Sequence, residues 1–225
     1  MTTITTTTMT RIPGTTEERL NAITHGLGLA LAFAASYVLL SAASRYGNAW
    51  NIWGCGVYVV TLIAAYTAST LSHAFQSPRL RHIFRAADQA IIFLFIAGCW
   101  TPISLSWLRG PAWGWTLLGA MWTVGLIGFI SKACFTHRVH LGAVSLALYV
   151  FQGALPVLFT WPMLAVMPHG LMFWFFAAGA CYLAGTIFFI YDHRIRYFHT
   201  GWHVAVLLGT TCHYIGALRY CTGIR

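Results

Sequence analysis

Residues 168–191 read PHGLMFWFFAAGACYLAGTIFFIY and contain no Asp, Glu, Lys or Arg. A helix needs about 20 mostly apolar residues to cross the hydrocarbon core of a bilayer, so this stretch predicts a transmembrane helix. Six further stretches of similar length share its apolar character. The sequence therefore predicts an all-α fold, an integral membrane bundle of seven transmembrane helices. The predicted spans are 23–44, 52–74, 86–107, 112–132, 140–161, 168–191 and 200–220.

The composition of the whole chain indicates a membrane protein. Its 225 residues are 58% hydrophobic and 8% charged, whereas soluble domains are typically about a quarter charged. The net charge of +9 would suggest a nucleic-acid partner in a soluble protein. Here the basic residues lie in short loops, so we expect them to set topology and contact anionic lipid headgroups. We expect a multi-pass protein of the cell inner (plasma) membrane with lipid partners and no nucleic-acid partner.

The basic residues also predict the orientation. Nine of the 13 Lys and Arg residues lie in the N-terminal segment or in the loops after the second, fourth and sixth predicted spans, and four lie on the other side. Because cytoplasmic loops carry an excess of Lys and Arg, the N-terminus is predicted to be cytoplasmic and the C-terminus outside. Residues 1–16 are Thr-rich and are predicted to form a disordered tail, followed by one membrane domain over 17–225. The six cysteines form no CxxC pair, so no thiolate metal site is expected.

Histidines at the ends of two predicted spans indicate a metal site. His199 and His203 are spaced i, i+4, which puts both imidazoles on one helix face, about 40° apart around the axis. His73 ends the second span on the same predicted side of the membrane, and Asp88 lies near the start of the third. Three protein ligands plus a water is the catalytic arrangement of zinc. We therefore predict that His73, His199 and His203 bind Zn²⁺. Asp88 would hold the zinc-bound water or act as general base.

Asp88 and Ser69 are the predicted catalytic partners of this metal. An intramembrane carboxylate costs about 2.5–3.5 kcal/mol on insertion scales, so it usually has a partner and a function. The alternative is that the span boundary is misplaced and Asp88 is a solvated cap of the third helix. Ser69 lies four residues before His73 and so faces the same site, where it would orient the water or stabilise an oxyanion. Its alternative is a hydrogen bond to its own helix backbone.

Two further histidines, His25 and His213, lie on predicted spans. His25, preceded by Asn21, opens the first span on the same side and is predicted to position a metal ligand. His213 lies about 15 Å beyond His203 along the last helix, which is too deep for the same metal. It is expected to be either a buried hydrogen-bonding residue or part of a polar cavity.

These residues form an ordered pattern over essentially all of 17–225. The pattern consists of Glu17-Glu18, Asn21, His25-Gly26, Ser69-Thr70-Leu71-Ser72-His73, Asp88, Ile91, Ile96-Ala97-Gly98, Thr101-Pro102, His199, Trp202-His203 and His213. It resembles the hemolysin III family, the bacterial branch of the progestin and adipoQ receptors (PAQR). The resemblance implies an N-in, C-out bundle with zinc near the cytoplasmic face, held by His73, His199 and His203. Gln89 departs from the aromatic residue or His that many members carry there.

The resemblance leaves the function open between two classes. Relatives in the wider superfamily include ceramidases, which implies a zinc-dependent lipid amide hydrolase using a zinc-bound water. Other bacterial members look like regulators of membrane lipid composition, which implies a non-catalytic receptor or regulator in membrane homeostasis with structural zinc. A hemolysin-type cytolysin is disfavoured, since the chain looks constitutively multispanning. A proton or ion transporter relaying through His25, Asp88 and His213 ranks below the first two. The sequence leaves the oligomeric state and the lipid unknown.

Overall fold

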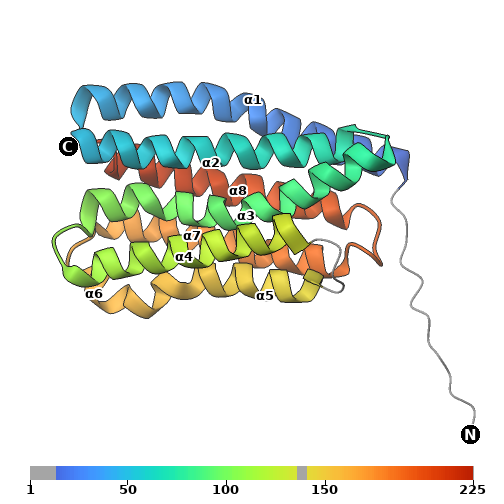
Figure 1. Cartoon of the computed structure of the whole chain (residues 1–225). Coiled ribbons are helices and arrows are strands. Elements are labelled where there is room, and N and C mark those ends of the chain that lie inside the picture. Colours follow the sequence, from blue (N-terminus) through green and yellow to red (C-terminus); the bar gives the residue numbers. More distant parts are fainter. Residues whose placement is uncertain (1–13, 136–140, 225) are drawn as a thin grey trace, which may run out of the picture.

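The computed structural model describes residues 14–135 and 141–224, and most of these residues are helical. The described part contains no β-strand, which confirms the all-α fold. The helices run side by side along one long axis (Figure 1). Their bounds are α1 Thr15–Tyr46, α2 Ala49–Ala74, α3 Pro78–Trp107, α4 Ala112–Phe135, α5 Leu141–Ala154, the 3-10 helix η1 Leu155–Phe159, α6 Thr160–Leu164, α7 His169–Tyr191 and α8 Phe198–Tyr220. Residues 1–13 of the predicted tail lie outside the described residues, and α1 already begins at Thr15.

Six segments are long and apolar enough to cross a membrane: α1, α2, α3, α4, Val144–Leu164 and α7. They coincide with the first six predicted spans. The last helix, α8, has 23 residues, which at 1.5 Å per residue is about 35 Å. Its three histidines lower its hydropathy, and it is not among the six. The seventh span and the orientation of the termini therefore stay predictions.

The fifth predicted span, 140–161, is interrupted near Pro156, although Val144–Leu164 as a whole is long and apolar enough to cross a membrane. α5 ends at Ala154, η1 follows, and α6 begins at Thr160. Pro156 has no N–H to continue the helical ladder, and its ring collides with the carbonyl four residues earlier. The residue at that earlier position, Gln152, is fully buried and fastens α5 to its neighbours. Its Nε2 donates to a backbone carbonyl of α3 and to one of α4, both at 3.0 Å.

The outer surface of the bundle is apolar. Trp161 is 86% exposed, and Tyr37 and Leu158 are each 77% exposed. Large apolar side chains displayed in this way are unfavourable in water and suit a lipid environment. The polar residues that matter for function lie inside the bundle, where many of them are buried.

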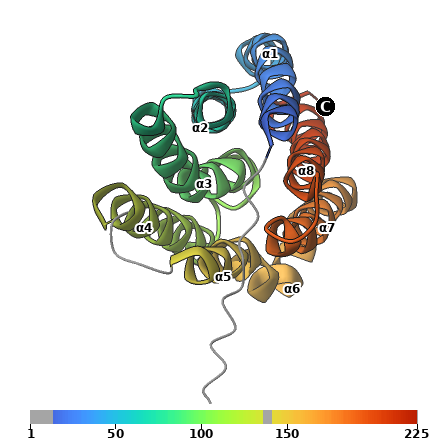
Figure 2. The same ribbon diagram turned by 90° about the vertical axis from the view of Figure 1, so that its right-hand side faces the viewer.

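The arrangement of the helices brings distant parts of the sequence together at one end. In the end view α8 lies beside both α1 and α7 (Figure 2). The start of α1, the end of α2, and the starts of α3 and α8 all lie at the same end of the bundle, and the end of α8 lies at the opposite end (Figure 1). The segments that carry the predicted metal ligands and Asp88 therefore meet.

Candidate metal centre

Three histidine side chains converge where α2 ends and α8 begins. His73 lies in the last turn of α2, and His199 and His203 lie in the first two turns of α8. One ring nitrogen of each lies within 4.8 Å of those of the other two. Two nitrogens on one tetrahedral zinc are about 3.3 Å apart, so the set fits a zinc ion after an inward movement of about an ångström. The three predicted ligands thus form a cluster that could hold a metal.

Two of these imidazoles are held by carboxylates. His73 Nδ1 lies 2.6 Å from Glu18 Oε2, and His199 Nδ1 lies 2.8 Å from Asp192 Oδ2. An ionised carboxylate can only accept a hydrogen bond, so it fixes the proton on Nδ1 of its partner. Nε2 is then left with a free lone pair. Metal-binding histidines are oriented in this manner by carboxylates and carbonyls.

The third imidazole, His203, is held by the backbone of α1. Its Nδ1 lies 3.2 Å from the carbonyl oxygen of Asn21 and 3.2 Å from the hydroxyl of Thr24. The carbonyl again selects the tautomer with a free Nε2. The His25 ring stacks on the His203 ring with centroids 3.7 Å apart and an interplanar angle of 8°. Both residues predicted to position the metal ligands, His25 and Asn21, therefore contact His203.

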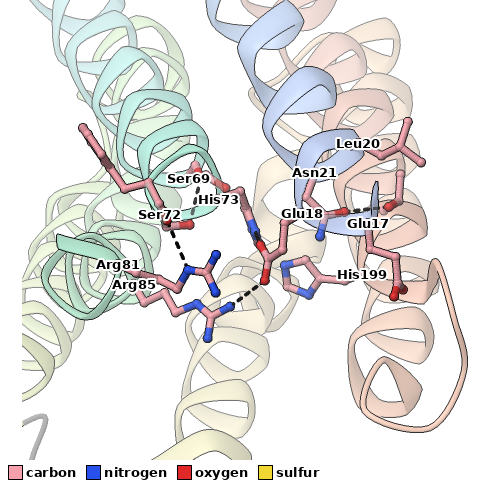
Figure 3. A network of polar contacts seen from close by, with 12 residues as sticks. Glu17, Glu18, Leu20, Asn21, Ser69, Ser72, His73, Arg81, Arg85 and His199 are labelled. Carbon is pink, nitrogen blue, oxygen red and sulfur yellow. Dashed lines mark hydrogen bonds and ion pairs between the residues drawn. The ribbon is translucent and has the colours of Figure 1, made fainter. Parts of the chain in front are cut away.

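Glu18 connects the metal centre to α3. While its Oε2 holds His73, its Oε1 accepts from Arg85 Nη2 at 2.9 Å, and the carboxylate is buried (Figure 3). Both contacts are charge-assisted hydrogen bonds, the stronger kind. The neighbouring Glu17 accepts instead from the backbone N–H of Tyr197 at 2.8 Å. Tyr197 has a φ of +64° immediately before α8. The hydrogen bond from Glu17 therefore stabilises the turn that precedes His199.

Asp88 and Ser69 lie beside the histidines. α3 begins at Pro78, so Asp88 lies well inside the helix and is not its cap. Its Oδ2 lies 3.4 Å from the hydroxyl of Ser72. It is not one of the three residues whose ligand atoms cluster, which leaves it free to act on a metal-bound ligand. Ser69 is buried, and its hydroxyl lies 2.7 Å from His25 Nδ1.

The histidines line one end of a cavity of about 740 Å³. The chain contains four acidic residues, and all four line this cavity: Glu17, Glu18, Asp88 and Asp192. Away from the acids the lining is mostly aromatic and aliphatic, and it continues to His213. The cavity thus has a polar end that carries the metal-ligand candidates and a long apolar interior, the shape expected for a lipid-like ligand.

Part of the cavity wall is formed by accessible side chains of η1 and α7. Val157, Phe176 and Leu183 line the cavity and are also 51%, 43% and 57% exposed. Side chains of η1 and α7 that line the cavity thus keep a large accessible area.

Two contacts of the site were not found from the sequence. The first predicted span begins at residue 23 and the sixth ends at residue 191, so Glu18 and Asp192 fall just outside them, and neither is predicted to contact a histidine. A signal was available, because all four acids fall near predicted helix ends on one side of the membrane, and carboxylates commonly hold metal-binding histidines. Gln89, the departure noted above, accepts from Lys132 Nζ at 2.9 Å. His137 and His140 lie outside the described residues.

Comparison with known proteins covers the whole site. Residues 14–214 match the family described as Haemolysin-III related. The chain is 34% identical over 208 residues to the Hemolysin-3 homolog of Bacillus subtilis (strain 168), covering 92% of this chain and 96% of that protein. It is 36% identical over 205 residues to the Hemolysin-3 of Bacillus cereus, covering 91% of each.

Proposed function

The chain belongs to the haemolysin III family, and we propose that it is a zinc-dependent hydrolase of an amide or ester bond in a membrane lipid. As a member of this family, with six apolar helices, it is a multi-pass protein of the plasma membrane. The observation that carries the proposal is the cluster of three histidines, each with Nδ1 held by an acceptor oxygen, at the polar end of an apolar cavity.

Zinc is the proposed metal because of the donor set. Three imidazole nitrogens leave one position of a tetrahedral site open, as in hydrolytic zinc enzymes. A zinc ion bound there would act as a Lewis acid and lower the pKa of a bound water to about 7. His73, His199 and His203 would hold the ion, and Glu18 and Asp192 would keep the first two rings in the binding orientation.

The remaining groups supply proton transfer and substrate binding. In the proposed reaction a carboxylate oxygen of Asp88 takes a proton from the attacking water and returns it to the leaving nitrogen or oxygen. The hydroxyl of Ser69, held by His25, would donate a hydrogen bond to the carbonyl oxygen as negative charge develops on it. The apolar part of the cavity would bind the acyl chain and exclude water from the reacting bond.

We also propose that α8 is a seventh span and that the metal centre faces the cytoplasm. α8 contacts α1 and α7 along the bundle, and at about 35 Å it is long enough to cross. An odd number of crossings puts the two ends of the domain on opposite sides of the membrane. The excess of Lys and Arg on the side of the metal centre supports a cytoplasmic location for that side.

The test combines metal analysis with lipid hydrolysis. Purified protein in detergent should contain about one zinc per chain and should release fatty acid from ceramide or phospholipid vesicles. The double variant His199→Ala/His203→Ala should lose both. The matched control is His169→Ala, which removes a histidine from the first residue of α7. Turnover that persists without zinc would refute the proposal.

A non-catalytic regulator with structural zinc is the second candidate. It is favoured by the origin of the ligands, because a zinc ion held by His73 and by the two histidines of α8 would link α2 to α8. In that case zinc removal would lower the melting temperature of the protein, but the protein would release no fatty acid from ceramide or phospholipid vesicles. Wild-type protein with full zinc content and no hydrolysis would support this candidate over the hydrolase.

A further inference from the structure

The inner end of the cavity carries a histidine with one unused nitrogen. His213 lines the cavity and is 6% exposed. Its Nε2 lies 2.9 Å from the carbonyl oxygen of Cys99. A carbonyl can only accept, so Nε2 carries the proton and Nδ1 is a bare acceptor. Nδ1 is buried and has no hydrogen-bond partner among the described residues.

The wall between His213 and the metal centre contains two tyrosines that differ in their hydrogen bonding. Tyr66 is 4% exposed, and its hydroxyl also has no hydrogen-bond partner among the described residues. Its ring packs against His25 with centroids 5.1 Å apart. Tyr182 lines the same cavity, but its hydroxyl lies 3.3 Å from that of Thr210. The wall of the inner cavity therefore contains two buried polar atoms without partners in the described part of the chain, which is unfavourable.

The distance between the metal centre and His213 determines where on a ligand a group that contacts His213 must lie. Along α8, His213 lies about 15 Å beyond His203. An extended covalent chain advances about 3.3–3.6 Å for every three bonds, so this distance corresponds to about a dozen bonds. A lipid whose polar head lies at the histidine cluster would bring the middle of its acyl chain to His213.

We propose that His213 forms a subsite for a hydroxyl group on the acyl chain, about a dozen bonds from the polar head of the lipid. The ligand hydroxyl donates its hydrogen bond to His213 Nδ1. The chemical class is a mid-chain hydroxylated fatty acid or a lipid that contains one. This inference rests on the proposed function, because the head of the ligand is placed at the metal centre.

The test measures the affinity of purified full-length protein for four fatty acids by displacement of a fluorescent fatty acid. The probes are octadecanoate and its 12-hydroxy, 6-hydroxy and 12-oxo derivatives. The 12-hydroxy acid should bind about tenfold more tightly than octadecanoate, the ratio expected for one net hydrogen bond. The 6-hydroxy acid places its hydroxyl at the wrong depth, and the 12-oxo acid cannot donate to Nδ1. Both should therefore bind no more tightly than octadecanoate.

Two variants assign the effect to the proposed atom. His213→Phe should remove the preference for the 12-hydroxy acid while octadecanoate still binds. Tyr214→Phe is the matched control and should keep the preference, because its hydroxyl donates to the carbonyl of Ala35 and the residue is not part of the cavity lining. Equal affinities of octadecanoate and the 12-hydroxy acid for wild-type protein would refute the subsite. So would equal affinities of the 12-oxo and 12-hydroxy acids, a result that needs no variant to fold.

The outcomes also separate this subsite from the proposed function. A tenfold preference without zinc or hydrolysis would refute the hydrolase and support the subsite. Zinc-dependent hydrolysis without a preference for the 12-hydroxy acid would support the hydrolase and refute the subsite. If none of the four acids binds, the subsite is refuted.

Discussion

Exchanging Glu18 for Gln keeps the shape of the side chain and removes its charge. In the structure Glu18 Oε2 lies 2.6 Å from His73 Nδ1, and Oε1 lies 2.9 Å from Arg85 Nη2. The amide nitrogen of Gln cannot accept, so only one of these two contacts can persist. Loss of such a partner typically costs 10–100-fold in metal affinity, which is about 1.4–2.8 kcal/mol. We expect Glu18→Gln to weaken zinc binding by this factor.

The affinity can be measured by competition with a chromogenic zinc chelator on detergent-solubilised protein. Glu17→Gln is the matched control, because its amide oxygen can still accept from the Tyr197 N–H, and the contact that it gives up is the one from the Gly14 N–H at 3.2 Å, just before the start of α1. Its zinc affinity should stay close to that of wild type. If Glu18→Gln binds zinc as tightly as wild type with an unchanged melting temperature, Glu18 does not orient His73 for a metal.

Three further outcomes are expected. Asp192→Asn should weaken zinc binding by less than Glu18→Gln, in the same competition assay, because the contact of Asp192 with His199 is about a quarter exposed and solvent screens it. Asp88→Asn should keep about one zinc per chain by metal analysis but reduce lipid hydrolysis by about 10²–10⁴-fold, and undiminished turnover would exclude Asp88 from proton transfer. Gly98→Ala should lower stability by about 1–3 kcal/mol through overpacking, seen as a lower melting temperature, because an added Cβ would collide with Thr61.

The apolar helices and the histidine cluster could be predicted because both depend on local patterns. Hydropathy over about 20 residues locates a span, and the spacing of His199 and His203 fixes their common helix face. Alternation of the spans then puts His73 at the same level. Each step uses residues close in sequence, so a single sequence is sufficient for it.

The carboxylates that hold the histidines could not be assigned in the same way. Glu18 was expected to precede the first helix, but it lies in the first turn of α1 and is buried. Its partners, His73 and Arg85, come from α2 and α3. A hydropathy pattern treats an acid at the end of an apolar stretch as solvated, since nothing local indicates a distant partner. The interruption after α5 has a local cause in Pro156, but proline inside a membrane helix can also be accommodated, as Pro102 is in α3.

The formal charges of the cavity fit a divalent cation bound by neutral histidines. Its lining includes four carboxylates and two basic side chains, Arg85 and Lys132, which together leave two formal negative charges when the histidines are neutral. Charges are expensive within a bilayer and are usually paired there. The hydrogen bonds to Glu18 and Asp192 require neutral imidazoles with protonated Nδ1 if Nε2 is to bind a metal, so the histidines do not supply the missing positive charge. A bound Zn²⁺ would bring the formal charge of the cavity to zero, whereas a monovalent ion would leave one negative charge. A chain with so few acids, all of them lining one cavity, therefore has a charge balance that a dication held by these histidines would complete.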